Sequence, residues 1–191
     1  MKVARILSPV HSLGPGNRVC LWTQGCSKQC PGCIAPELQN SGKRDVPEQL
    51  LAEIVRQAAE NGNCTGLTIS GGDPFEQAPA LLSFLRLIRK SFSDILIYTG
   101  FTIDEILSGE TEQAGAEALQ FIDVLIDGRY IAERNNPNCV MRGSDNQIIH
   151  YLTPSHRAIY EEYMKQGRVL ETFQHNGSVI ITGIQNEEHT K

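Results

Sequence analysis

The sequence predicts an α/β fold: a partial βα barrel followed by a C-terminal helix and β-hairpin. Short apolar runs with the composition of buried strands alternate along the chain with amphipathic helical patterns, as expected for a largely parallel sheet. Loops rich in glycine or proline follow several of these runs. The chain has 191 residues, which fits one domain but is shorter than the roughly 250 residues of a full eight-stranded barrel. We therefore expect the barrel to be incomplete.

The first clear strand is predicted at residues 18–23. It leads into a loop at 24–36 that is too rich in Cys, Gly and Pro for regular structure. A helix is expected at about 46–60, with Asp45 and Glu48 forming a capping box at its start. Its apolar stripe, expected to face the core, consists of Leu50, Leu51, Ile54, Val55 and Ala58.

Further βα steps follow this helix. A short buried strand is predicted at 65–70, and a second amphipathic helix at about 74–89. Strands are then expected at 94–99 and 121–126, with one or two helices between them. The residues that the second helix is expected to bury are Leu81, Leu82, Leu85 and Ile88.

The remaining chain predicts a strand, a helix and a hairpin, at 148–152, 154–165, and 168–173 with 178–182. Asn176-Gly177 is the hairpin turn, because this dipeptide favours tight turns between strands. The polar residues from Gln185 onward are expected to fray. We expect residues 1–152 to form the core and 153–191 to form an extension packed on it or beside it.

Composition and charge exclude several classes of function. Apolar residues make up 40% and charged residues 20%, which suits a folded protein and is too apolar for a disordered one. The net charge is −5 with scattered Lys and Arg, whereas a nucleic-acid surface needs a basic stripe. No run approaches the roughly 18 apolar residues of a membrane span, and residues 1–5 do not resemble a signal peptide. We expect a cytoplasmic protein that contacts neither nucleic acid nor membrane.

Three of the six cysteines, Cys26, Cys30 and Cys33, carry the strongest chemical signal in the sequence. Their spacing is too tight for several unstrained disulfides, so a reduced, metal-binding group is favoured. Thiolates bind iron in cubane clusters, normally four to a cluster, and three close ligands leave one iron open to an external ligand. A metal needs such an open position in order to act on a substrate. The motif therefore predicts a [4Fe-4S] cluster with one free iron.

Two other kinds of metal site are weaker alternatives. A zinc site would need a fourth ligand such as Cys20, Cys64 or His11, and zinc ligands usually come as two spaced pairs. An electron-transfer ferredoxin would need a fourth cysteine and is usually a smaller chain. Cys20, Cys64 and Cys139 are better interpreted as small buried residues.

Four loops that follow predicted strands share the composition of a functional rim. They are the cysteine loop, Gly71-Gly72, Thr99-Gly100 and Asp127-Gly128. In βα sheets and barrels the chemistry lies at the carboxyl ends of the strands. We therefore expect these four loops to converge.

In these segments the chain resembles the radical S-adenosylmethionine superfamily, whose signature is C-x3-C-x2-C. Within it, the chain is similar to the family of anaerobic ribonucleoside-triphosphate reductase activating proteins, which are small glycyl-radical activases. The matching segments run in order along residues 14 to about 152. They are Gly14-Pro15-Gly16-Asn17-Arg18, Gly25-Cys26 to Cys30-Pro31-Gly32-Cys33, Ser70-Gly71-Gly72-Asp73-Pro74, Tyr98-Thr99-Gly100-Phe101, Asp123 to Tyr130, and Arg142-Gly143-Ser144-Asp145-Asn146-Gln147.

The resemblance implies a radical-SAM type of partial barrel whose cluster, held by Cys26, Cys30 and Cys33, binds S-adenosylmethionine at the open iron. Reduction by a flavodoxin-like or ferredoxin-like donor would release methionine and a 5′-deoxyadenosyl radical, which in activases takes a hydrogen from a glycine of a large partner enzyme. No catalytic side chain is expected beyond the cluster ligands, since the protein positions the cofactor and excludes water. The cofactor-binding residues implied are Gly32, Cys33, Ile34, Gly71, Gly72, Asp73, Thr99, Asp127, Gly128 and Arg129.

Simpler roles remain open for several of these residues. Asp73, followed by Pro74, is also a well-formed helix cap. Thr99-Gly100 and Asp127-Gly128 could be plain strand-ending turns. The polar run 142–147 is either a recognition segment facing the cofactor or a solvated loop.

The chain also departs from the family pattern. Gly32 and Ile34 flank Cys33 where many relatives have an aromatic residue, and Met141 stands where an aromatic usually precedes the Arg-Gly-Ser segment. Residues 153–191 extend past the usual end of the small activases. The alternatives are therefore a radical enzyme whose extension supplies extra walls around another peptide or a small molecule, and a metal-stabilised binding module without turnover.

Overall fold

A six-stranded sheet forms the centre of the computed structural model, which describes residues 1–185 except 41, 43–44 and 176. The strands lie in chain order, with β2 to β5 parallel and with β1 and β6 antiparallel at the two edges. Chain order with parallel central strands is the pattern of consecutive βα units, so the partial βα barrel is confirmed. The strands are β1 (Val3–Val10), β2 (Arg18–Thr23), β3 (Gly66–Gly71), β4 (Asp94–Tyr98), β5 (Val124–Asp127) and β6 (Ile148–Tyr151).

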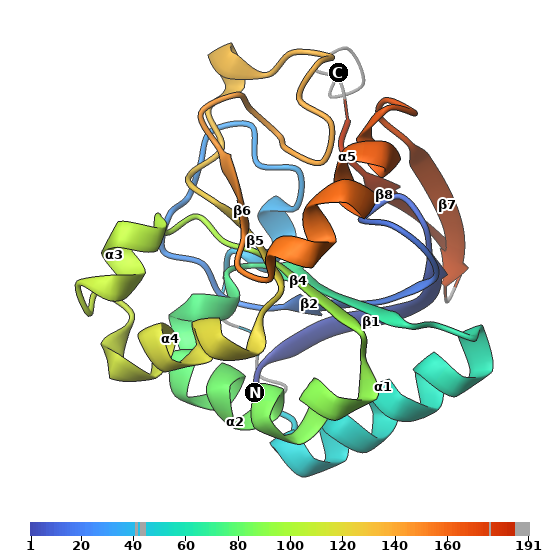
Figure 1. Ribbon diagram of the computed structural model, residues 1–191, viewed down its shortest axis with the longest axis vertical. Coiled ribbons are helices and arrows are strands. Elements are labelled where there is room, and N and C mark those ends of the chain that lie inside the picture. The colour runs from blue at the N-terminus through green and yellow to red at the C-terminus, as the bar shows by residue number, and fades with distance from the viewer. Residues whose placement is uncertain (41, 43–44, 176, 186–191) are drawn as a thin grey trace.

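The helices and the hairpin surround this sheet (Figure 1). Short 3-10 turns extend several elements, among them Pro74–Gln77 before α2, Leu119–Phe121 before β5 and Pro154–His156 before α5. No helix among the described residues is long and apolar enough to cross a membrane. The elements are α1 (Glu48–Gly62), α2 (Ala78–Ile88), α3 (Ile103–Leu107), α4 (Glu112–Ala118), α5 (Arg157–Met164), β7 (Leu170–His175) and β8 (Ser178–Gly183).

The two faces of the sheet are covered by different parts of the chain. Helices α1, α2 and α4 lie on one face, where Leu67 and Ile69 of β3 pack with Leu81 and Leu85 of α2. On the opposite face, which we call the inner face, Leu96 of β4 and the side chains of Val124 and Ile126 pack against Tyr160 of α5. The alternation of residues along each strand produces this division.

The C-terminal segment is joined to the inner face by polar contacts as well as apolar ones. The Tyr160 hydroxyl is fully buried and donates to both oxygens of Asp94, at 2.9 Å each. The Glu171 carboxylate of β7 accepts from the amides of His11 and Ser12, at 2.8 and 2.6 Å. Phe173 packs in the same region against a small cluster that contains Val10, Leu13 and Cys20.

Two expectations about the first helix are wrong. Its N-cap is Pro47, with no side-chain cap, because the Asp45 and Glu48 carboxylates accept from the Met1 amine at 2.6 and 2.9 Å. The buried stripe is also rotated from the one expected. Leu51 and Val55 are buried as expected, but Leu50 and Ile54 are 48% and 40% exposed, and Ala52 and Ala59 are buried in their place.

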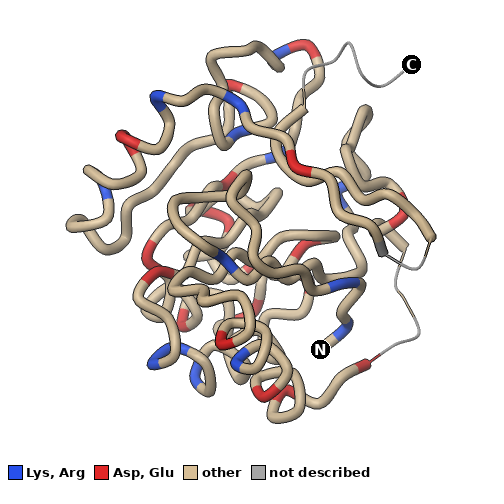
Figure 2. Tube along the Cα trace, turned by 90° about the vertical axis from the view of Figure 1, so that its right-hand side faces the viewer, with Lys and Arg blue, Asp and Glu red and all other residues tan. Residues whose placement is uncertain are grey.

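Strand β1 is not among the predicted elements. The other elements agree with expectation within a few residues, and Leu81, Leu82, Leu85 and Ile88 of α2 are buried as expected. Two helices, α3 and α4, lie between β4 and β5. Asn176 of the hairpin turn and residues 186–191 of the polar end lie outside the described residues. Acidic and basic residues are interspersed along the trace without a long stretch of one sign (Figure 2).

Candidate cluster site

The cysteine loop leaves the carboxyl end of β2 and lies against the loop that follows β3. The Gly72 amide donates to the Thr23 carbonyl at 2.9 Å, and the Asp73 amide donates to the Gly25 carbonyl at 2.8 Å. A Cβ atom at Gly71 or Gly72 would overlap the backbone of Thr23 or Gly25, so only glycine allows this approach. The structure thus accounts for the Gly-Gly pair by chain packing, and contact with a cofactor remains a prediction.

The Cys26 end of the loop is held from two sides. The amides of Gly25 and Cys26 donate to the carbonyls of Leu38 and Gln39, at 2.8 and 2.9 Å. The Glu76 carboxylate, which precedes α2, accepts from the Ser27 amide at 3.0 Å and from the Ser27 hydroxyl. The backbone around the first cysteine is therefore fixed by hydrogen bonds to both neighbouring segments.

The next residue of the motif, Lys28, reaches the loop that follows β4. Its ammonium nitrogen lies 3.4 Å from the centre of the Phe101 ring, a cation–π contact. A Cβ atom at Gly100 would lie 3.1 Å from Lys28 Cγ. The convergence expected from the sequence is therefore observed for the loops after β2, β3 and β4.

All three motif cysteines are free thiols and half-buried. Burial raises the pKa of the Cys26 thiol above its ordinary value, while the amides of Lys28 and Gln29 hydrogen-bond the sulfur and act in the opposite direction. Amides directed at a sulfur are typical of iron–sulfur sites, where such hydrogen bonds set the reduction potential. The donor set therefore fits a cluster held by thiolates.

A single zinc ion would hold the three motif sulfurs close together. Tetrahedral zinc with bonds of about 2.3 Å holds its sulfurs roughly 3.8 Å apart. Among the described residues, the three motif sulfurs do not all lie within 4.8 Å of one another. Cys20, Cys64 and Cys139 are buried in the protein, as expected, and burial raises the pKa of Cys20 to about 12.

Asp73 is buried and joins the loops after β3 and β4. Its carboxylate accepts from the Phe75 amide at 3.0 Å, from the Thr99 hydroxyl at 2.8 Å and from the Gly100 amide at 2.7 Å. Burial raises the pKa of Asp73 to about 6, against the effect of these donors. The helix-cap interpretation is correct, and the same side chain fixes Thr99-Gly100, a role that the sequence did not reveal.

Asp127, Gly128 and Arg129 lie at the end of β5, and the first two are buried, so a plain surface turn is wrong for them. Asp127 Oδ2 accepts from the Ile103 amide at 2.7 Å and lies 2.9 Å from His150 Nε2. Arg129 is exposed. All three residues line a cavity of about 580 Å³ that also contacts Gly100 and His150.

The polar run 142–147 is not a solvated loop. Ser144 is fully buried, and Gln147 Oε1 accepts from the amides of Gly143 and Ser144 at 2.7 and 3.2 Å. The side chains of Ser144, Asn146 and Gln147 also form hydrogen bonds with the backbone that follows β5. The sequence did not single out Lys28, Glu76 and Tyr130 near the cysteines, or His150 beside Asp127, because their roles depend on contacts between distant segments.

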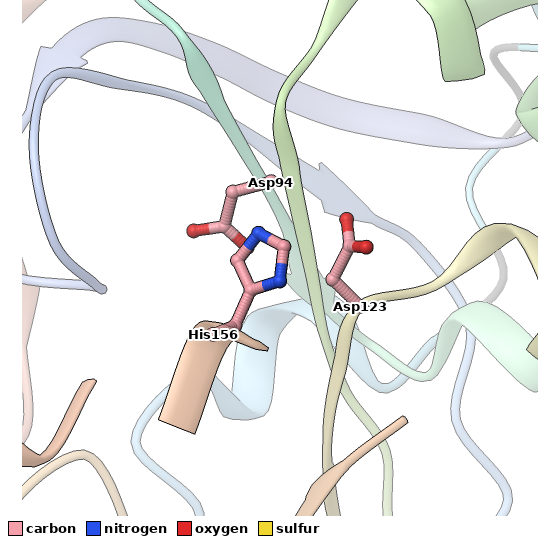
Figure 3. A group of neighbouring side chains, drawn as sticks. All are labelled: Asp94, Asp123 and His156. Atoms are coloured by element: carbon pink, nitrogen blue, oxygen red, sulfur yellow. The ribbon is translucent and has the colours of Figure 1, made fainter. Parts of the chain in front are cut away.

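A second group of potential ligands lies at the other end of the strands, where Asp94, Asp123 and His156 approach one another (Figure 3). The carboxylates are already engaged. Arg18 Nη1 lies 2.6 Å from Asp94, and Arg89 Nη1 lies 2.9 Å from Asp123. This group is therefore an ion-pair cluster at the amino ends of β4 and β5, away from the cysteine loop.

Comparison with known proteins agrees with this geometry. A family model described as a 4Fe-4S single cluster domain matches residues 12–150. The anaerobic ribonucleoside-triphosphate reductase-activating protein of Escherichia coli (strain K12) is 30% identical over 148 residues, which is 73% of this chain and 91% of the relative. The protein of the same name from Vibrio cholerae is 34% identical over 149 residues, with the same coverage. That of Enterobacteria phage T4 is 32% identical over 140 residues, which is 70% of this chain and 83% of the relative.

The matched region contains the cysteine loop and the strand ends that meet beside it, and it stops before the C-terminal segment that covers the inner face. The chain therefore belongs to the radical S-adenosylmethionine superfamily, in the family of the anaerobic ribonucleoside-triphosphate reductase-activating proteins.

Proposed function

We propose that this protein holds a [4Fe-4S] cluster through Cys26, Cys30 and Cys33 and generates a glycyl radical on a large partner enzyme. The observation that carries the proposal is the cysteine loop itself, with three free thiols beside the loops after β3 and β4. When bound and supplied with an electron from a flavodoxin-like or ferredoxin-like donor, such a cluster would provide the reductive cleavage of S-adenosylmethionine to methionine and a 5′-deoxyadenosyl radical. The names of the relatives make an anaerobic ribonucleotide reductase the partner that we propose.

In this proposal the protein's side chains bind and shield. Arg129 is an exposed cation at the cavity after β5, suited to the carboxylate of an amino-acid moiety. Asp127 has one oxygen bonded to the Ile103 amide and would use its remaining capacity for the ammonium group. Ile34 is 58% exposed beside Cys33, where an apolar side chain would limit access of water to the site.

Other predicted cofactor residues hold the loops around the site in place. The three donors to the Asp73 carboxylate already occupy it, so we propose that it holds Thr99 and Gly100 in place rather than binding the ammonium itself. Gly71 and Gly72 bring the loop after β3 against the cysteine loop. Gly32 and Gly128, both at positive φ, give their loops conformations that other residues rarely adopt.

The test is anaerobic reconstitution with iron and sulfide, followed by reductant and S-adenosylmethionine. We expect formation of 5′-deoxyadenosine and methionine and, with the partner reductase, a glycine-centred doublet in electron paramagnetic resonance. A colourless zinc protein without turnover would instead indicate a metal-stabilised module. Cleavage without any doublet on the reductase would indicate another substrate, an alternative favoured by the C-terminal segment that walls the inner face.

A variant of Asp127 tests the cofactor side of the proposal. Asp127→Ala should weaken binding of S-adenosylmethionine by roughly tenfold, through loss of one charge-assisted hydrogen bond. The visible absorbance of the cluster should stay unchanged, because Asp127 is not a ligand. Equilibrium binding to the reconstituted protein measures this effect, with the exposed Asp104→Ala of the same cavity as the matched control. Equal affinity in both variants would remove Asp127 from the cofactor site.

A further inference from the structure

The second half of the cysteine motif has a protein contact that the proposed function does not explain. Gly32, between Cys30 and Cys33, stands at φ +72, and the Cys33 amide closes a turn by donating to the Cys30 carbonyl at 3.2 Å. A Cβ atom at Gly32 would lie 3.3 Å from Tyr130 Cε1. The edge of the Tyr130 ring therefore lies against the turn that carries two of the three thiols.

The opposite edge of the ring is held equally closely. A Cβ atom at Gly143 would lie 2.8 Å from Tyr130 Cδ2 and 3.3 Å from Cε2, so the ring fits between two glycines from distant parts of the chain. The Asn135 amide donates to the Tyr130 hydroxyl at 3.2 Å. The ring is thus fixed on both edges and at its tip.

The backbone that carries Tyr130 is fixed by the polar run 142–147. Gln147 Nε2 donates to the Gly128 carbonyl at 2.8 Å, and Asn146 Nδ2 donates to the Arg129 carbonyl at 2.7 Å. The buried Ser144 hydroxyl accepts from the Ile131 amide at 3.1 Å. Three side chains of one short run thus bind both sides of Tyr130, which leaves the ring little freedom to move.

We propose that Tyr130 is a positioning residue that holds the Cys30–Cys33 turn in the conformation that binds the cluster, with the run 142–147 as its support. The inference rests on the proposed function, since it assigns Tyr130 a task toward the same cluster. It also explains why the two ends of the motif differ. The Cys26 end is fixed by backbone hydrogen bonds and Glu76, whereas side-chain packing by Tyr130 secures the Cys33 end.

The variant Tyr130→Ala tests this on the reconstituted protein. We expect loss of the cluster to a chelator to become roughly tenfold faster, as for other residues that support metal ligands, and the resonance spectrum of the reduced cluster to change shape. Tyr130→Phe keeps the ring and should restore both properties. The matched control is Tyr151→Ala, which removes another half-buried tyrosine, one that packs near Tyr160.

The metal-free protein gives an independent readout. Alkylation of each cysteine, followed by mass spectrometry, should become faster at Cys30 and Cys33 in Tyr130→Ala and stay unchanged at Cys26. If that variant does not fold, Gly143→Ala displaces the ring through the 2.8 Å contact and is judged by the same measurements.

The outcomes separate the two proposals. Chelator rates, spectra and alkylation equal to those of Tyr151→Ala would overturn the role of Tyr130 while leaving the cluster intact. A wild-type protein that binds no iron and sulfide would overturn the proposed function. In that case selective alkylation at Cys30 and Cys33 would still show that Tyr130 holds the turn.

Discussion

The two ends of the parallel strands use their polar groups in different ways. At the amino ends, Arg18 is fully buried and its guanidinium donates to Asp94 at 2.6 Å, to the Thr68 hydroxyl at 2.6 Å and to the Leu67 carbonyl at 2.8 Å. At the carboxyl ends, the three thiols are half-buried and Arg129 is exposed. Both ends contain charged or ligating side chains, so residue type alone does not distinguish them.

The difference teaches how to recognise a site. A buried charge that is matched by its neighbours contributes to the uniqueness of the fold, and removal of one partner is costly. Groups that keep free donors or lone pairs beside glycine-rich loops remain available to a ligand. The carboxylates of Asp94 and Asp123 are already engaged by Arg18 and Arg89, whereas the three cysteines of the loop are free thiols.

The largest effect expected is at the carboxyl ends. Cys30→Ala should abolish cluster assembly and 5′-deoxyadenosine formation together, because two thiolates do not retain a cubane that normally needs at least three protein ligands. Iron and sulfide analysis measures assembly. Cys64→Ala, which removes a buried thiol away from the loop, is the control and should retain both. Normal product formation by Cys30→Ala would show that the ligands are assigned wrongly.

At the amino ends the effect should be on stability instead. Asp94→Ala leaves the buried Arg18 without its partner and should lower the free energy of unfolding by about 3–5 kcal/mol. Glu117→Ala removes an exposed partner of Arg86 and should cost no more than about 1 kcal/mol. Urea unfolding of the metal-free proteins makes the comparison. Equal losses in the two variants would mean that the buried network does not support the fold.

The smallest effect is a pH dependence at Asp73, which joins the loops at the carboxyl ends of β3 and β4. Its pKa is raised from 3.8 to about 6, so the folded protein binds a proton that the unfolded chain has already released at intermediate pH. This contribution to stability is therefore present at low pH and is lost as pH rises toward 6, with a total of up to about 3 kcal/mol.

Asp73→Asn should lack this dependence. Relative to the wild type, the stability of the variant should improve as pH rises from 4 to 7, as followed by urea unfolding of the metal-free proteins. A constant difference across this range would mean that Asp73 titrates normally. In that case the hydrogen bonds from the Phe75 amide, the Thr99 hydroxyl and the Gly100 amide would fully stabilise the charged Asp73 carboxylate.

Much of the architecture followed from sequence pattern, because the βα alternation depends on short-range periodicity. The strand Val3–Val10 was not predicted, since Ser8-Pro9 interrupts its apolar character and it pairs only at the sheet edge. In α1 the stripe containing Leu50 and Ile54 has the same helical period as the one that is buried. The buried side includes the small residues Ala52 and Ala59, which a pattern of large apolar residues does not reveal.

Some residues of the candidate site could be predicted from the sequence, and others could not. The cysteine motif and the strand-end glycines were visible because their signals are local. Tyr130 contacts Gly32, 98 positions away, and Arg18 contacts Asp94, 76 positions away. Such long-range contacts cannot be predicted from a single sequence. Asp73 showed its capping role in the sequence, whereas its bonds to Thr99 and Gly100 required the three-dimensional arrangement.

The hydrogen bonds from the amides of His11 and Ser12 to the Glu171 carboxylate have a consequence for truncated variants of this protein. It joins the C-terminal hairpin to the turn between β1 and β2, so residues from the two ends of the chain together cover this part of the protein. Shortening the chain to residues 1–152 would match the activase family more closely but would uncover Val10, Leu13 and Cys20 and leave Asp94 without Tyr160. We therefore expect the smallest stably folded unit of this protein to be longer than the region that it shares with its relatives.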